Sequence, residues 1–133
     1  TGVFDFADGA IAHLTTSFDV HHGDFGNIVV HGSEGSLRVP DPNGFDGDVM
    51  IRRKGDGEWR LLDPIVPTHV NGRGLGLIDL VRAVREGREP RASGALAYHV
   101  LDAMLAVEEA SAAGRHIELT SGVARPDSLG ADF

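Results

Sequence analysis

The chain has 133 residues, with 20 acidic and 12 basic side chains and no cysteine, which gives a formal net charge of −8 with histidine neutral. This length accommodates one domain with a conventional core and leaves no room for a second full domain. The lack of cysteine excludes disulfides, thiolate metal sites and a cysteine nucleophile, and it fits a reducing compartment, so we expect a cytoplasmic protein. Nucleic acid and membranes are not expected partners, because such binders usually carry basic patches.

The first sixty residues show the two-residue period of strands. Residues 2–7 and 10–18 flank Asp8-Gly9, a strong hairpin signal. Alternate positions of the second run are mostly apolar, namely Ala12, Leu14, Thr16, Phe18 and Val20. One face of this strand should therefore pack on a core, and its mixed opposite face hints at a partner surface.

Four further runs predict strands, at residues 27–32, 36–39, 48–53 and 58–62. Residues 40–44 (PDPNG) form a loop, because two prolines remove ladder donors and Asn-Gly favours positive φ.

From residue 63 the period changes to that of helices. Apolar residues at three-residue spacing predict a helix over 74–87, which Gly87 stops. A longer helix begins after the N-cap Ser93 and ends at Gly114. Its expected buried stripe is Leu96, Val100, Ala103, Met104 and Val107.

A last short strand is expected at residues 117–119. Strands first and helices after indicate an α+β fold. We expect an open, mainly antiparallel sheet of about six or more strands, with two C-terminal helices packed on one face.

Familiar catalytic and cofactor motifs are missing. Residues 72–77 (GRGLGL) lack the third glycine of a dinucleotide turn, no phosphate-binding P-loop occurs, and no serine sits in a nucleophile elbow. A metal site at His21, His22 and Asp24 is disfavoured against a solvated turn, because neighbouring turn histidines normally point apart. His99 is read as a structural, hydrogen-bonded residue in preference to a catalytic one.

One polar cluster is a candidate binding site. His69, Asn71 and Arg73 occupy an irregular segment before a helix, where binding groups are often placed, and a solvated loop is the alternative. Thr1 is not an initiator and the following residues are already strand-like, so we expect a fragment of a longer protein. No run of 18 apolar residues and no signal peptide is present in this sequence.

Five segments in consistent order resemble the carboxy-terminal domain of the glucose–fructose oxidoreductase, inositol dehydrogenase and MocA family. They are 12–20 (AHLTTSFDV), 28–37 (IVVHGSEGSL), 40–43 (PDPN), 73–80 (RGLGLIDL) and 91–104 (RASGALAYHVLDAM). The resemblance covers residues 1–126 and leaves 127–133 as a tail.

The resemblance implies part of an oxidoreductase. Family members bind NAD or NADP in an amino-terminal domain and carry a lysine at the end of that domain, with an Asp/His pair on the first helix of the substrate domain. None of these is present here, since the only lysine, Lys54, does not match the family's Glu-Lys-Pro motif. We therefore carry over no catalytic, cofactor-binding or metal-binding residue.

These features lead us to expect the substrate-binding and oligomerisation portion of an NAD(P)-dependent dehydrogenase for a sugar, polyol or related carbohydrate. His69, Asn71 and Arg73 would contact the substrate, and the open sheet face would join subunits of a homo-oligomer. The chain alone should be inactive. The alternative is a non-enzymatic dimerisation or binding module in which the sheet face is the whole function.

Overall fold

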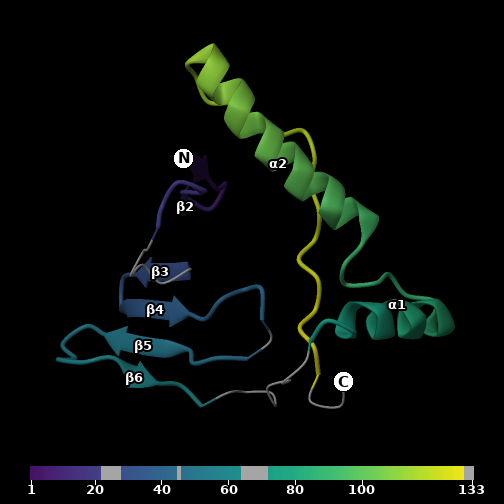
Figure 1. Ribbon diagram of the computed structural model, residues 1–133, viewed down its shortest axis with the longest axis horizontal. Coiled ribbons are helices and arrows are strands. Elements are labelled where there is room, and N and C mark those ends of the chain that lie inside the picture. Colours follow the sequence, from purple (N-terminus) through teal and green to yellow (C-terminus); the bar gives the residue numbers. More distant parts are fainter. Residues whose placement is uncertain (22–27, 45, 64–71, 131–133) are drawn as a thin grey trace. The chain divides into compact units, whose positions relative to one another are not determined.

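The computed structural model describes residues 1–21, 28–44, 46–63 and 72–130 (Figure 1). These residues contain six strands and two helices, and the predicted α+β class with antiparallel strands is confirmed. The chain divides into two compact units, Thr1–His21 with Leu80–Pro126 and His22–Asp79 with Asp127–Phe133. Each unit is described by itself below.

A hairpin opens the first unit. Strand β1 (Gly2–Asp5) pairs antiparallel with β2 (Ile11–Leu14). Oδ1 of Asp8 accepts the N–H of Ala10 at 3.0 Å and Gly9 has a φ of 89°, so the predicted Asp-Gly turn is confirmed. The second strand is shorter than the sequence predicts, and all four of its residues are exposed, because a two-stranded ribbon covers neither of its own faces.

The second unit holds a four-stranded antiparallel sheet in the order β3-β4-β5-β6 (Figure 1). Its strands are β3 (Ile28–Gly32), β4 (Gly35–Val39), β5 (Met50–Arg53) and β6 (Arg60–Leu61). They match the four predicted runs. The six strands thus form two open sheets of two and four strands.

Cross-strand register separates the two faces of this sheet. Val30, Leu37 and Ile51 lie side by side in one row across three strands. The neighbouring row begins with His31 and Ser36, whose Nδ1 and Oγ atoms are 2.8 Å apart. Because successive side chains of a strand point to opposite faces, one face is apolar and the other is polar along these rows.

Helix α1 (Leu75–Glu86) follows close to its predicted bounds, and Gly87 ends it with a φ of 67°. The buried residues of the described chain lie along one stripe of this helix, one turn apart: Leu75, Asp79 and Ala83.

Helix α2 (Gly94–Ala113) has both of its predicted ends. Oγ of Ser93 accepts the N–H of Leu96 at 3.1 Å, and Gly114 adopts a left-handed conformation with its N–H bonded to the carbonyl of Ala110. Within the described residues, neither α1 nor α2 combines the length and apolar composition needed to cross a bilayer.

The burial of α2 differs from the predicted stripe. Ala103 and Val107 are half-buried, whereas Val100 and Met104 are exposed by 49% and 61%. No α2 residue is fully buried, although the helix is apolar around most of its circumference. A helix of this kind normally lies in a protein interior. The packing of the two helices on one sheet face stays a prediction.

The last predicted strand is absent. Residues 117–119 join no ladder in the described structure, and the chain after Gly114 continues as an extended segment. His116 Nδ1 lies 2.9 Å from Oδ2 of Asp5, which links the start of this segment to β1.

Candidate functional site

Of the three predicted substrate-side residues, one is described. His69 and Asn71 lie outside the described residues, so their role stays a prediction. Arg73 is exposed just before α1, and its Nη2 donates a hydrogen bond to Oδ1 of Asn43 at 3.1 Å. Both residues belong to the second unit, so this contact joins two loops of one compact body.

The loop that carries Asn43 is itself ordered by Asp41. Oδ1 of Asp41 accepts the N–H of Asn43 at 2.8 Å, and the Asp41 carbonyl accepts the N–H of Gly44 at 3.1 Å. This arrangement is an Asx turn inside a β-turn, and it agrees with the loop predicted from the PDPNG segment. We call the three side chains Asp41, Asn43 and Arg73 the Arg73 hook.

Sequence reasoning missed Asn43 as a partner of Arg73. The two residues are 30 positions apart, and an Asn before Gly is explained locally by its turn preference. The available signal was the Asx-turn pattern, which holds the Asn backbone and leaves its side-chain amide free for a longer-range contact.

A second polar cluster lies in the first unit, where the extended segment returns along α2 (Figure 1). Oγ of Ser121 donates to Oδ2 of Asp102 at 2.6 Å and lies 2.8 Å from Nδ1 of His99. The backbone N–H of Ser121 also reaches Oδ2 of Asp102, at 3.3 Å. We call these three residues the Ser121 clasp.

The Ser121 clasp combines the residue types of a serine hydrolase in a different arrangement. Because the hydroxyl proton is given to the carboxylate, Nδ1 of His99 must donate to the serine oxygen. A nucleophilic serine needs the opposite polarity, with the imidazole accepting the hydroxyl proton. The half-buried clasp therefore ties the extended segment to α2, in line with a structural role for His99.

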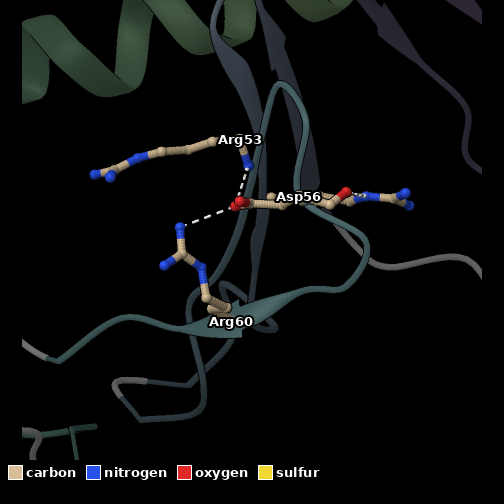
Figure 2. Close-up of polar contacts among 4 residues, drawn as sticks. Arg53, Asp56 and Arg60 are labelled. Carbon is tan, nitrogen blue, oxygen red and sulfur yellow. Dashed lines mark hydrogen bonds and ion pairs between the residues drawn. The ribbon is translucent and has the colours of Figure 1, made fainter.

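Two residues of the basic run, Arg52 and Arg53, contact Asp56 in the turn between β5 and β6. Oδ2 of Asp56 accepts the backbone N–H of Arg53 at 3.0 Å and Nη2 of Arg60 at 2.9 Å (Figure 2). Nε of Arg52 donates to the Asp56 carbonyl at 3.1 Å. The Arg53 N–H, followed by the Arg60 guanidinium, holds the pKa of Asp56 below its usual value of 3.8.

The histidines of the predicted turn do not form a metal site among the described residues. Of the disfavoured trio, His21 is described, while His22 and Asp24 lie outside the described residues. Among the residues that the structure describes, no group of three His, Cys, Asp or Glu side chains could hold a metal ion.

Comparison with known proteins found no match: no family model, no curated protein and no solved structure matches the chain.

Proposed function

We propose that this chain is the substrate-binding and oligomerisation portion of an NAD(P)-dependent oxidoreductase that acts on a sugar, polyol or related carbohydrate. The observation that carries the proposal is Arg73. It stands at the start of the RGLGLIDL segment, it is exposed, and its guanidinium is held by Asn43. The α+β class and the antiparallel strands also agree with the family that the sequence resembles.

The division of labour follows from the chemistry of the reaction. In the intact enzyme, a bound nicotinamide would supply the hydride-transfer chemistry at a substrate carbon, and a general base would take the hydroxyl proton. The residues of this chain hold the substrate. The nicotinamide belongs to a different segment, because Leu77 stands where a dinucleotide turn needs its third glycine and is part of α1.

The test is nicotinamide reduction by the polypeptide that includes the segment upstream of Thr1. A panel of sugars and polyols is supplied with NAD⁺ and with NADP⁺, and nicotinamide absorbance is followed. We expect turnover by the longer polypeptide and none by the 133-residue chain. Failure of the longer polypeptide with every substrate and both nucleotides would contradict the proposal.

A second candidate is a dimerisation module without catalysis, and it is favoured by exposed apolar surface. On the four-stranded sheet, Val30 is 50% exposed in the apolar row with Leu37 and Ile51. Leu37 and Ile51 are half-buried, so the row is partly exposed, and a partly exposed apolar row supports association through this face. Both candidates place a second copy of the chain on this face.

Neighbouring valines of β3 test the association. Val29 and Val30 have similar exposure, 40% and 50%, and point to opposite faces of the sheet. We expect an oligomeric mass by light scattering for the chain and for Val29→Glu, and a monomeric mass for Val30→Glu. Equal masses for all three proteins would contradict association through the apolar face. Association without nicotinamide turnover would favour the module.

A further inference from the structure

We propose that the Arg73 hook binds an oxyanion group, so that the substrate is an acidic sugar derivative such as a sugar acid or sugar phosphate. The inference rests on the proposed function, because it assigns a chemical class to the substrate of that site. Arg73 makes the contact, and Asn43 is a positioning residue that acts through Arg73.

The first argument is the charge that Arg73 retains. Its one hydrogen bond among the described residues goes to a neutral amide oxygen, at 3.1 Å. A guanidinium stays charged in proteins and presents several donors in a fixed fork, of which this bond uses one. Because the residue is exposed, its remaining donors and its positive charge are accessible to a ligand.

Two other arginines of this chain are paired with carboxylates. Arg60 pairs with Asp56 at 2.9 Å, and Arg88 pairs with Glu86 at 2.7 Å. Arg73, in contrast, is bonded to a neutral amide oxygen. The natural complement of its fork is a planar carboxylate or a phosphate, which it can bind through two parallel hydrogen bonds.

The second argument is that the guanidinium is held in place before any ligand arrives. Asp41 fixes the backbone of Asn43 at 2.8 Å, and Asn43 in turn fixes Arg73. An arginine held by one bond has lost part of its rotamer freedom already, so less conformational entropy opposes ligand binding. The carboxylate of Asp41 is used by this turn and forms no ion pair with Arg73 in the described part of the chain.

Asp41 also supplies a sharp test of charge. Its carboxylate bonds the backbone of Asn43, whose side chain bonds Arg73, so its negative charge opposes an anion bound at the guanidinium. An Asp41→Asn variant keeps an oxygen that accepts the Asn43 N–H and removes the charge. An anionic ligand should therefore bind this variant more tightly, whereas a neutral polyol should not respond.

The experiment is an NMR titration of the 133-residue chain with gluconate and glucose 6-phosphate, and with neutral sorbitol as the comparison. We expect at least one of the two anions to shift the Arg73 Nε–H signal and sorbitol to leave it in place. Asn43→Ala should weaken that binding about tenfold, which is the usual effect of losing a hydrogen bond to a charged group. It should also change the Arg73 Nε–H signal before ligand is added, which is the signature of positioning.

The matched control is Arg85→Gln. Arg85 is an exposed arginine in the last turn of α1, so the variant removes the same charge as Arg73→Gln at the other end of the helix. We expect Arg73→Gln to abolish anion binding and Arg85→Gln to preserve it. Equal effects of the two variants, equal shifts from sorbitol and the anions, or unchanged affinity in Asn43→Ala would each overturn the inference.

The two proposals fail in different ways. Nicotinamide reduction with a neutral polyol, without anion binding at Arg73, would overturn the anionic substrate class and leave the oxidoreductase intact. Anion binding at Arg73 without any nicotinamide reduction would support the hook as an anion site and contradict the oxidoreductase.

Discussion

The Arg73 hook and the Ser121 clasp use their hydrogen-bonding groups in opposite ways. In the clasp, the hydroxyl of Ser121 donates to Asp102 and accepts from His99, so the polar groups are satisfied by one another. In the hook, the chain of contacts ends on an exposed guanidinium bonded to a neutral oxygen. The clasp is therefore expected to contribute to folding, and the hook to bind something that the chain does not contain.

The largest expected effect comes from a substitution in the loop that carries Asn43. It should disturb the Arg73 hook and leave the Ser121 clasp in place. Gly47 has a φ of 107°, and a Cβ built there would lie 2.6 Å from Cβ of Pro40. Gly47→Ala therefore combines a disfavoured backbone conformation with overpacking and should cost about 3 kcal/mol in unfolding free energy. Urea denaturation measures this loss, and gluconate binding should fall with it because the loop carries Asn43.

Gly57→Ala is the control for that substitution. Gly57 has no atom within 4 Å of a built Cβ and no positive φ, so the change should be close to neutral. In Gly47→Ala, hydrogen exchange at the Ser121 amide should stay slow relative to exchange in the Asn43 loop. Equal stability of the two alanine variants, or loss of the clasp before the loop, would break the proposed separation.

The second effect is the loss of the clasp. Ser121→Ala removes the hydroxyl that both His99 and Asp102 use and leaves two half-buried polar side chains with fewer partners. The expected cost is about 1–2 kcal/mol in unfolding free energy, with faster hydrogen exchange along residues 117–123. Thermal or urea denaturation measures the first quantity, and exchange detected by NMR measures the second.

Ser111→Ala serves as the comparison for the clasp, because Ser111 is exposed on α2, the helix that carries His99 and Asp102. Its stability should change by less than about 0.5 kcal/mol. If Ser121→Ala and Ser111→Ala have the same unfolding free energy, Ser121 does not hold the segment after Gly114 on α2. Gluconate binding should be unaffected in both, and a loss of binding in Ser121→Ala would show that the clusters are not independent.

Local features of both regions could be predicted from the sequence. The Asp8-Gly9 turn and the caps at Ser93 and Gly114 depend on contacts within a few residues, and each is present. The antiparallel strands and the loop of Asp41 follow from the same short-range rules. Neighbouring residues set these conformations, so one sequence is enough to read them.

The partners within each cluster could not be predicted. Arg73 reaches Asn43 across 30 positions, and Ser121 reaches Asp102 across 19. Periodicity gives the face of a helix but not what covers it, so Val100 and Met104 were expected to be buried and are exposed. Long-range contacts depend on how the loops bring distant residues together, and the spacing of residues along one chain does not show which of them meet.

The smallest expected effect lies at the Asp56 turn, which resembles the hook in pairing an arginine but satisfies it with a carboxylate. The pKa of Asp56 is lowered in the folded chain, chiefly by the Arg53 N–H and then by Arg60. Its contribution to stability is therefore present above the usual value of 3.8 and is lost as pH falls through the lowered pKa.

Asp56→Asn keeps an acceptor for the N–H and removes the charge, so its stability deficit should shrink as the solution is acidified below that value. Urea denaturation of both proteins across this range measures the deficit, and salt should reduce it because the pair is exposed. Glu58→Gln is the control, since it removes an exposed neighbouring charge that takes no part in the contacts of Asp56 described above. A stability deficit that grows as pH falls would contradict the lowered pKa of Asp56. A deficit equal to that of Glu58→Gln would mean that Asp56 acts only as one more surface charge. A deficit that shrinks with acid, and only in Asp56→Asn, would set this neutralised arginine apart from Arg73, whose charge remains open to a ligand.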